Sequence, residues 1–535
     1  SSSDKIDRKR LPDPGFGTDE PRERMLPRTD LERAIAKVWS ECLGVAELDV
    51  HDNFFELGGH SLLAVRVRAG LADAFGFELP LRTMFDAPTV AGLAAIVADR
   101  ATPSRAPVAR RDYGDNAPLS SEQRRMWFLQ RLHPESTAYQ VPYAVRLTGV
   151  IDPAALEHAV QQLVDRHEVL RTVFPEEAGG PVQKILPTGT PVTWELLDAV
   201  VGQGAAEAVT ARLATPFDLA RELPLRASLL RIGDDEHVLL LLFHHIAIDE
   251  WTTHLALEEL RELYEARLEQ RSAALPALPI QYADYALWQA DRLQSDEHAA
   301  SVAFWREELR GGPDHIDWPA GSEPAGTEHP AGAVEFGWDA ELSVGLRELA
   351  RARGTTLFSV LHALFVAYLA RFSGQRDLTV GLPVTTRERS ELQGLIGFLL
   401  NTVPMRSQIP ASASFDEWLT QATARWQATT SHQWLPLEEI VQAVGGARTG
   451  GGLPLFDVMF TYVPGDPVAG TFGGACLESF DYGGLLEAKT ALVAFFGDDG
   501  ARLRGSFEYD AARFGAPDVE RLVASFQHFV RQCLD

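Results

Sequence analysis

Residues 237–251 read HVLLLLFHHIAIDEW, in which the most apolar short run of the chain ends in two histidines followed closely by an acidic pair. The run has the length and composition of a buried strand. Because neighbouring side chains on a strand point to opposite faces, His244 and His245 would not readily bind one metal ion together, and no HExxH motif is present. We therefore expect no metal site, one histidine facing the core and one facing a cleft.

The position of these histidines permits two interpretations. A histidine at the end of a buried strand, just before a helix that begins at Asp249 or Glu250, is well placed to exchange protons in a cleft. Alternatively, both histidines only end the strand and form local hydrogen bonds. The residues by themselves leave both interpretations open.

On both sides of this stretch, amphipathic helical segments alternate with strand-like runs, as in an α/β protein. Helices are predicted over residues 151–170, 251–270 and 342–354, and strands over residues 143–150, 237–245 and 376–384. The pattern covers more than four hundred residues, which is too long for one hydrophobic core. We therefore predict two lobes, formed by residues 118–290 and 291–535.

The N-terminal part of the chain has a different pattern. Residues 1–27 are polar and charged, contain Pro and Gly, and lack apolar periodicity, so they are predicted to be a tail. Residues 28–100 show apolar side chains at helical spacing and are predicted to form a small four-helix bundle. The periodicity stops again over residues 101–117, which are expected to be a linker.

Ser61 stands between a glycine-containing loop and the first apolar turn of a predicted helix. A serine at such a position usually caps the helix by accepting hydrogen bonds from free backbone N–H groups. It can also carry a phosphodiester, since helix N-termini favour anions. The one general base nearby in the sequence is His60, so we expect Ser61 to be modified by another enzyme and not to act as a nucleophile itself.

Composition and charge exclude several classes of partner. The 535-residue chain has a formal net charge of -26, so neither nucleic acid nor an anionic membrane is expected to bind it. No signal segment and no membrane-spanning run is visible, which favours a cytoplasmic location. The three cysteines, Cys42, Cys476 and Cys533, are far apart and are predicted to be inert thiols.

The helical N-terminal part carries a specific motif. Residues 52–71, DNFFELGGHSLLAVRVRAGL, resemble the peptidyl carrier protein of nonribosomal peptide synthetases, whose motif ends in GGHS or GGDS. The resemblance implies that a phosphopantetheinyl transferase attaches 4'-phosphopantetheine covalently to Ser61. Residues 3–12, SDKIDRKRLP, are similar to the closing motif of an adenylation domain, with Lys5 at its catalytic lysine. Residues 1–27 are therefore expected to be the tail of an upstream adenylation domain.

The histidine stretch also resembles a known motif. HHIAIDEW, residues 244–251, is similar to the HHxxxDG motif of condensation domains, which are related to chloramphenicol acetyltransferase. Other signatures of that family occur in order along the chain: LSSEQRRMW (119–127), RHEVLRTVF (166–174), YADYALW (282–288), IGFLLNTVPMR (396–406) and HQWLPLE (432–438). The resemblance implies two chloramphenicol-acetyltransferase-like α/β lobes arranged as a V around a central tunnel. Donor and acceptor carriers are expected to reach this tunnel from opposite faces.

The same resemblance assigns roles to individual residues. His245 is expected to be catalytic, with His244 beside it in the motif, and Asp249 is expected to be structural and paired with Arg387. Glu250 replaces the glycine of the family motif. If Glu250 faces the tunnel, its charge would favour protonated His245 and narrow the acceptor path; otherwise it lies at the surface of a helix N-terminus.

Two further residues are candidates for the tunnel. Trp251, next to Glu250, would lie in the tunnel wall. The second candidate is Arg125 in the first signature. It would either face the tunnel or form a buried ion pair, and the sequence favours neither interpretation.

By this resemblance the chain takes part in nonribosomal peptide synthesis. The carrier would hold an aminoacyl or peptidyl thioester, and the condensation domain would transfer it to the amine of an acceptor aminoacyl thioester, forming a peptide bond. Whether His245 acts as a base or as a positioning group is left open. The implied partners are a downstream acceptor carrier protein and its adenylation domain, and the chain is expected to be a monomer.

Two rival functions are retained. Epimerisation domains share the histidine motif, and a degenerate condensation domain can serve as a non-catalytic docking or recruitment module. Heterocyclisation domains carry paired aspartates in place of the histidines, so that function does not fit.

Overall fold

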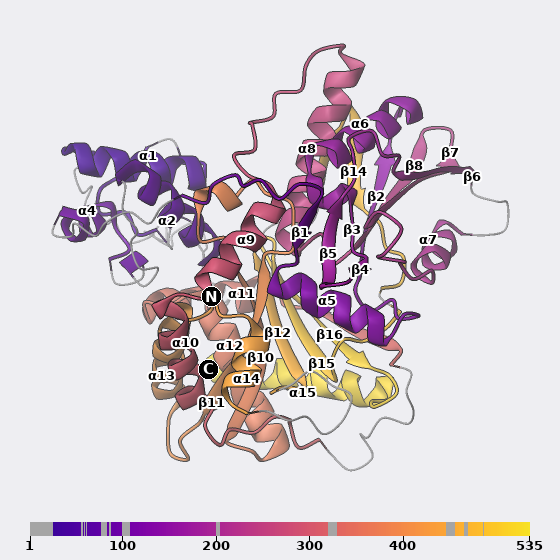
Figure 1. Cartoon of the computed structure of the whole chain (residues 1–535). Coiled ribbons are helices and arrows are strands. Elements are labelled where there is room, and N and C mark those ends of the chain that lie inside the picture. The colour runs from indigo at the N-terminus through magenta and orange to yellow at the C-terminus, as the bar shows by residue number, and fades with distance from the viewer. Residues whose placement is uncertain are drawn as a thin grey trace, which may run out of the picture.

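The computed structural model shows a small helical unit, drawn in indigo, beside a larger unit made of two α/β halves (Figure 1). It describes residues 25–534 except 46, 55, 56, 58, 60, 76–82, 85, 86, 99–106, 199–203, 319–328, 446–454, 465–468 and 485. Most of the predicted N-terminal tail and the first part of the predicted linker lie outside the described residues. The predicted α/β architecture behind a small helical bundle is confirmed.

The helical unit is built on an apolar core. Its helices are α1 (Asp30–Leu43), α2 (Ser61–Phe75) and α4 (Val90–Ala98), and Thr83 and Met84 between them are also helical. Thr29 caps α1 in a capping box with Glu32, and Gly44 ends it in the left-handed conformation that glycine adopts without strain. The core is formed by Ile35, Trp39, Phe54, Val67, Leu71 and Leu93.

The N-terminal half contains a six-stranded sheet. Its strand order is β13 (Ala469–Phe472), β14 (Ala475–Ser479), β2 (Gln140–Thr148), β8 (Glu236–His244), β7 (Leu225–Gly233) and β6 (Thr193–Asp198). Strand β8 pairs antiparallel with both β2 and β7, and all of its side chains from His237 to His244 are buried. Burial on both faces explains why its apolar run is continuous and does not alternate.

Helices and a smaller sheet complete the N-terminal half. The helices are α5 (Ser121–Leu132), α6 (Pro153–Arg166), α7 (Ala205–Leu213), α8 (Glu250–Leu268) and α9 (Tyr282–Arg292), with the 3-10 turn η1 (Glu168–Arg171). The smaller sheet contains β1 (Asn116–Pro118), β3 (Thr172–Val173), β4 (Glu176–Glu177) and β5 (Gly180–Ile185). Helices α6 and α8 pack against each other, so α8 is held in place directly after β8.

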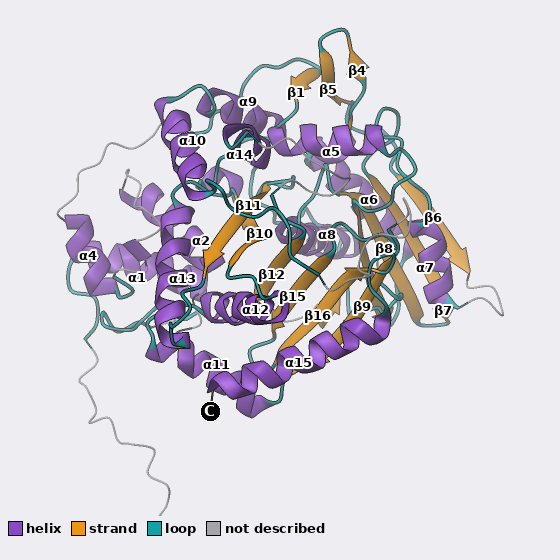
Figure 2. Cartoon of the chain, turned by 90° about the horizontal axis from the view of Figure 1, so that it is seen from below, coloured by secondary structure: helices purple, strands orange, loops and turns teal. Residues whose placement is uncertain are grey.

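The C-terminal half has a second six-stranded sheet. Its strand order is β11 (Leu400–Gln408), β10 (Asp377–Thr385), β12 (Val458–Pro464), β15 (Leu492–Asp498), β16 (Leu503–Asp510) and β9 (Ala331–Gly337). Its helices are α10 (Asp296–Glu308), α11 (Ala340–Ala352), α12 (Leu357–Ser373), α13 (Phe415–Thr430), α14 (Leu437–Ala443) and α15 (Ala516–Leu534), with the turn η2 (Ser390–Leu392). Helices α12 and α15 lie side by side against this sheet (Figure 2).

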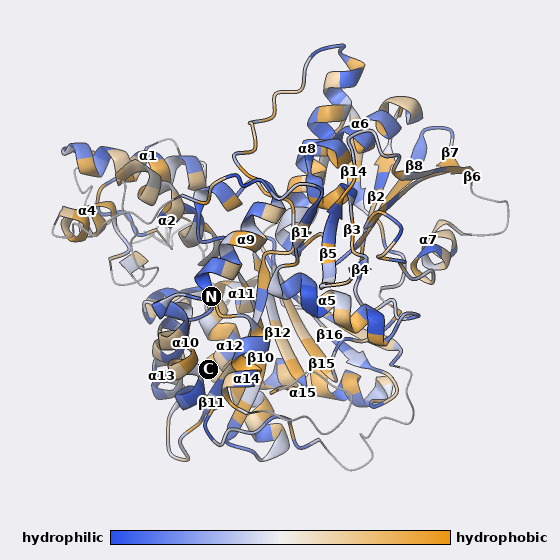
Figure 3. Cartoon of the chain, in the orientation of Figure 1, coloured by the Kyte–Doolittle hydropathy of each residue, from blue (hydrophilic) through white to orange (hydrophobic). Residues whose placement is uncertain are grey.

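The two halves exchange chain segments. Strand β14 pairs antiparallel with β2, so residues 469–479, which follow most of the C-terminal sheet in sequence, extend the N-terminal sheet. Ile396 and Phe398 also pack in the core of the N-terminal half. The predicted division at residues 290 and 291 therefore does not follow the sheets. Apolar residues are concentrated in the strands of both sheets (Figure 3).

The described helices differ from membrane spans in length or hydropathy. No single one of them is long and apolar enough to cross a membrane. Helices α11 and α12 together have the length and the hydropathy of a membrane span, but they are bent by 106° relative to each other. Ten residues of α12 are buried, which is the pattern of a core helix.

Candidate functional site

A cavity of about 1530 Å³ opens between the two halves and reaches the helical unit. His245, Asp249, Glu250 and Trp251, at the β8–α8 junction, form one part of its wall. Other lining residues are Arg125 on α5, Lys489 and Glu508 from the C-terminal half, and Gly59, Leu63 and Arg66 from the helical unit. The cavity thus brings together the candidate residues of the histidine stretch and the end of the helical unit that carries Ser61.

His245 is held with one ring nitrogen free. Its backbone N–H donates to the carbonyl oxygen of Tyr139 at 2.9 Å, which continues the pairing of β8 with β2. Its Nδ1 lies 2.8 Å from the carbonyl oxygen of Ile248. A carbonyl only accepts hydrogen bonds, so Nδ1 carries the proton and Nε2 is left as an acceptor in the neutral imidazole.

The electrostatic environment keeps His245 neutral. Burial of the ring lowers its pKa to about 3, and the positive charge of Lys489 acts in the same direction. We expected a tunnel-facing Glu250 to favour the protonated imidazole; burial and Lys489 dominate the shift instead, and the effect of Glu250 on this pKa stays a prediction. An imidazole with this pKa can accept a proton or a hydrogen bond at neutral pH without first having to lose a proton.

His244 points into the core of the N-terminal half. It is 1% exposed, accepts a hydrogen bond at Nδ1 from the Ile246 N–H (3.1 Å), and places Nε2 3.3 Å from Gln130 Oε1. Burial lowers its pKa to about 3, and its ring lies edge-on to Phe217 at 5.8 Å. His244 does not belong to the cavity wall, so its contacts support the turn that presents His245.

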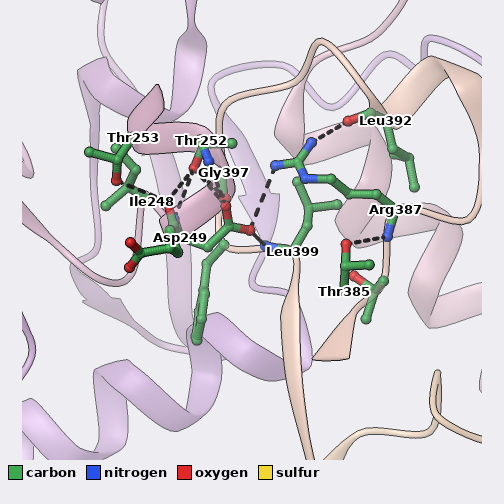
Figure 4. A network of polar contacts seen from close by, with 12 residues as sticks. Ile248, Asp249, Thr252, Thr253, Thr385, Arg387, Leu392, Gly397 and Leu399 are labelled. Carbon is green, nitrogen blue, oxygen red and sulfur yellow. Dashed lines mark hydrogen bonds and ion pairs between the residues drawn. The ribbon is translucent and has the colours of Figure 1, made fainter. Parts of the chain in front are cut away.

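Asp249 fixes the start of α8. Its Oδ1 accepts hydrogen bonds from the backbone N–H and the hydroxyl of Thr252, and its Oδ2 accepts from the backbone N–H of Leu399 (Figure 4). The bond from the Thr252 N–H and the reciprocal bond from the Asp249 backbone N–H to Thr252 Oγ1 (2.9 Å) form a capping box, which satisfies backbone donors that the helix leaves free. The third contact joins α8 to the segment that leads into β11 of the C-terminal half.

The structure brings Arg387 to Asp249. The guanidinium Nη2 lies 3.6 Å from Asp249 Oδ2, and Nη1 donates to the carbonyl oxygen of Leu392 (Figure 4). Both side chains are 1% exposed. Burial lowers the pKa of Arg387, and Asp249 opposes that effect. The ion pair therefore compensates two buried charges and joins the two halves beside His245.

The segment before β11 also contacts His245 directly. The ring of Phe398 lies 4.6 Å from that of His245, and the Phe398 carbonyl oxygen accepts a hydrogen bond from the Tyr282 hydroxyl (2.7 Å). That hydroxyl is also 2.9 Å from Ser120 Oγ, and Ser120 caps α5. These contacts join three of the sequence signatures in one buried network around the histidine.

The remaining predicted tunnel residues line the cavity. Glu250 is exposed to it as the first residue of α8, and Trp251 follows. Arg125 Nε lies 3.5 Å from Glu438 Oε1, in the signature HQWLPLE, so this arginine both lines the cavity and forms an ion pair.

Two charged cavity residues were missed from the sequence. Burial lowers the pKa of Lys489, while Glu508 and Glu250 oppose this shift. Burial raises the pKa of Glu508, which Lys489 counteracts. Neither residue belongs to a recognised motif, and nothing in the local sequence marked either as part of the site.

Ser61 lies at the helical unit's end nearest the cavity. It is the first residue of α2, where the helix dipole favours an anionic group. A Cβ atom on Gly59 would lie 2.4 Å from Phe54, so only glycine fits this close approach just before the helix. Gly59 and Leu63 both line the cavity. His60 lies outside the described residues.

Helix α2 contacts the larger unit through two arginines. Arg68 Nη2 donates to the carbonyl oxygen of Glu388 at 3.1 Å, and the guanidinium of Arg66 lies 5.8 Å from the centre of the Trp251 ring. The Glu388 carboxylate is in turn paired with Arg292 at 3.0 Å. The helical unit thus contacts Trp251, two residues after Asp249, and Glu388, which directly follows Arg387.

Metal-ligating side chains are not clustered here. Among the residues that the structure describes, no group of three or more His, Cys, Asp or Glu side chains is arranged to hold a metal ion. The described cysteines, Cys42, Cys476 and Cys533, are all free thiols.

Comparison with protein families gives two matches. A family model described as "Condensation domain" matches residues 113–535, and one described as "Phosphopantetheine attachment site" matches residues 33–97. The second match indicates a covalently attached 4'-phosphopantetheine. The helix N-terminus at Ser61 and the glycine-only approach at Gly59 fit such a group.

Curated relatives are large synthetases. A linear gramicidin synthase protein of Brevibacillus parabrevis is 37% identical over 539 residues, which cover 98% of this chain and 10% of that protein. A dimodular nonribosomal peptide synthase of Bacillus subtilis (strain 168) is 38% identical over 464 residues, which cover 86% of this chain and 19% of that protein. The chain therefore spans a small part of the length of these relatives.

Solved structures share the fold. The X-domain in its complex with OxyB from teicoplanin biosynthesis has a TM-score of 0.72 and 24% identity, covering 81% of this chain and 96% of that one. The first condensation domain of the calcium-dependent antibiotic synthetase, bound to a substrate analogue, has a TM-score of 0.67 and 22% identity, and the match covers 79% of this chain and 97% of that one. At these identities the likeness concerns the fold.

Proposed function

Because the chain belongs to the condensation-domain family of nonribosomal peptide synthetases and has a phosphopantetheine attachment domain ahead of it, we propose that it forms peptide bonds between two carrier-bound substrates. Residues 28–100 act as the carrier and residues 118–535 as the condensation domain. The donor is an aminoacyl or peptidyl thioester on this chain's carrier, and the nucleophile is the amine of an aminoacyl thioester on a second carrier.

The observation that carries this proposal is the state of His245 within a shared cavity. Its Nδ1 is committed to the Ile248 carbonyl, so the free Nε2 is the group that can accept the amine proton as the carbon–nitrogen bond forms. The same cavity is lined by Gly59 and Leu63 beside Ser61. Holding both reactants near one imidazole lowers the entropic part of the barrier.

Ser61 is the proposed attachment residue. When bound there, 4'-phosphopantetheine supplies a thiol that holds the acyl group as an activated thioester. The residues of this chain orient the carrier: Arg66 and Arg68 contact the condensation domain, and the start of α2 faces the cavity. A phosphopantetheinyl transferase, an upstream adenylation domain, and a downstream adenylation domain with its carrier are the partners that this role requires.

The carrier assignment is tested by mass spectrometry. Treatment with a phosphopantetheinyl transferase and coenzyme A should add the mass of one phosphopantetheine to the wild-type chain and none to the Ser61→Ala variant. A mass gain that persists in Ser61→Ala would move the attachment to another residue.

The condensation assignment is tested by product formation. The donor-loaded chain is mixed with a loaded acceptor carrier, and the acceptor thioester is examined for an added amide-linked residue. The His245→Ala variant should reduce the rate by about 10²–10⁴-fold, as expected for loss of a positioned base, while His158→Ala, which replaces an exposed histidine on helix α6, should not. Inversion of the donor without amide would indicate epimerisation, and no reaction with any acceptor would indicate a recruitment module.

A further inference from the structure

Formation of an amide creates negative charge on the donor carbonyl oxygen, and the cavity offers few cations to meet it. Arg125 lies 3.5 Å from Glu438, and Arg347, another lining residue, lies 2.5 Å from Asp498. Their charges are thus already compensated by ion pairs, and the two other lining arginines, Arg66 and Arg351, are exposed. Lys489 differs, because in the part of the chain that the structure describes no hydrogen bond or ion pair engages its ammonium group.

Lys489 is also electrostatically coupled to the histidine. Its positive charge is the largest contribution after burial to the lowered pKa of His245. Glu250 on α8 and Glu508 on β16 favour its ammonium form against the effect of burial. Burial raises the pKa of Tyr143 on β2 and of Tyr482, and the negative charge of Glu250 adds to both shifts. Tyr509 and Glu487 are further titratable side chains that line a smaller cavity together with Lys489.

Residues 486–488, which directly precede Lys489, are held by two sets of hydrogen bonds. Glu487 accepts hydrogen bonds from the hydroxyls of Ser136 and Thr137 and from the Thr137 N–H, at 2.6–3.0 Å. In addition, the Ala488 N–H donates to the His329 carbonyl oxygen at 2.8 Å, and the Leu486 carbonyl oxygen accepts from the Ala331 N–H at 3.0 Å. A charge fixed in this way needs little reorganisation when the charge of the substrate changes, which is the property of an effective electrostatic catalyst.

Resting on the proposed function, we propose that Lys489 is a catalytic residue that stabilises the negative charge formed on the donor carbonyl oxygen. The acceptor nitrogen forms a bond to the carbonyl carbon, and one electron pair of the C=O bond moves to the oxygen beside the Lys489 ammonium. His245 Nε2 takes the proton from the nitrogen. The C=O bond then reforms, the carbon–sulfur bond breaks, and the proton passes from His245 to the departing thiolate. No oxidant or reductant is needed.

The first test compares single-turnover rates of amide formation by the holo, donor-loaded chain with an aminoacyl pantetheine thioester as acceptor. Lys489→Met should slow the reaction by about 10²–10³-fold, as for removal of one charge-stabilising donor, and Lys489→Arg should restore much of the loss. Lys184→Met, an exposed lysine on β5, is the matched control and should retain the full rate. Full activity in Lys489→Met, or equal losses in the Met and Arg variants, would overturn the proposal.

The second test does not depend on turnover. The rate at which diethylpyrocarbonate modifies His245 is followed by mass spectrometry from about pH 2 to 8, a range that includes the lowered pKa of about 3, because the reagent modifies only the neutral ring. Loss of the Lys489 charge should move the midpoint of this titration to higher pH in Lys489→Met and leave it in place in Lys489→Arg. An unmoved midpoint in Lys489→Met would show that the Lys489 charge has no electrostatic effect at His245, and it would contradict the proposed role of Lys489. Failure of the wild-type chain to form amide would count against the proposed function alone, since this titration would still report on Lys489.

Discussion

At the scale of single residues, one hydrogen bond determines what His245 can do. The Ile248 carbonyl holds the proton on Nδ1, and burial together with Lys489 prevents a second proton from binding. The neighbouring His244 has the same side chain but is enclosed by Gln130 and Phe217. Two adjacent and identical side chains therefore have different roles because the strand directs them to opposite faces.

The lowered pKa of His245 predicts the pH dependence of amide formation. A histidine whose pKa is lowered to about 3 stays neutral from pH 8 to about pH 4, so its titration cannot reduce the rate over that range. The acceptor amine must be neutral to attack, and free α-amino groups titrate at about 7.7–8.0. The rate should therefore decrease as the pH is lowered, with one inflection at the pKa of the acceptor amine.

This dependence is measured by single-turnover rates with acceptors whose amines differ in pKa. The inflection should follow the amine from one acceptor to the next. A fixed second inflection near pH 6.5 would show that His245 titrates normally and would contradict its assigned state.

Glu250 gives a second prediction at this scale. Replacing it with glycine, the residue of the family motif, removes a negative charge that offsets Lys489. The Glu250→Gly variant is expected to keep or increase the rate of condensation, measured with the same loaded substrates. Glu258→Ala, farther along α8 on the cavity wall, serves as the control. Complete loss of condensation in Glu250→Gly alone would show that the carboxylate is required.

At the scale of secondary structure elements, the N-terminus of α8 combines a helix cap with a buried ion pair. Asp249 caps the helix, accepts from Leu399 and faces Arg387, and both charged groups are shielded from water. A buried ion pair contributes little net stability, but removal of one partner leaves the other charge uncompensated. The α8 terminus is therefore sensitive to any change that leaves Arg387 alone.

The Asp249→Ala variant should consequently lower the free energy of unfolding by about 3–5 kcal/mol. Asp152→Ala provides a matched control, because Asp152 also caps a helix, α6, but is exposed and has no buried cation to compensate. Loss of that cap is expected to cost about 1 kcal/mol. Denaturant unfolding of both variants measures the difference, and equal losses would show that the Arg387 charge is not the cause.

The elements were predictable from the sequence where a local pattern encodes them. Strand β8 occupies residues 236–244 against a prediction of 237–245, because a strand buried on both faces has a continuous apolar run. Lys489 was not predictable, since it lies in an irregular segment whose position depends on contacts made by Glu487 and Ala488 with distant residues. The pairing of β14 with β2 was missed for the same reason, because no local pattern specifies the partner of a strand.

At the scale of the whole molecule, the carrier lies against the condensation domain through a small polar contact. Arg68 reaches the backbone of Glu388, whose side chain is fixed by Arg292, and Arg66 approaches the Trp251 ring. The Arg292 guanidinium lies 4.0 Å from the Trp434 ring centre, which holds it in place. The docking surface is thus already ordered on the condensation domain, and the carrier contributes two arginine side chains to it.

Replacing both Arg66 and Arg68 with alanine should weaken this docking. A hydrogen bond from a charged donor and an exposed cation–π contact together correspond to about 2 kcal/mol, or a roughly thirtyfold change in the docking equilibrium. Amide formation from the chain's own loaded carrier should slow accordingly, while transfer from a soluble donor pantetheine thioester should not. Arg33→Ala, on the exposed face of α1, is the control. Equal slowing with both donors would place the effect in the condensation domain and not in docking.

The crossing of residues 469–479 into the first sheet bears on any attempt to recombine synthetases. A chimera spliced once, near residue 290, would receive β13 and β14, at one edge of that sheet, from one parent and the other four strands from the other parent. Mismatched edges of this kind expose unpaired backbone and invite aggregation. A graft that transfers the first half together with the hairpin of residues 469–479 would keep the pairing of β14 with β2 within one parent sequence. The sites at which two synthetases can be recombined should therefore leave this pairing intact.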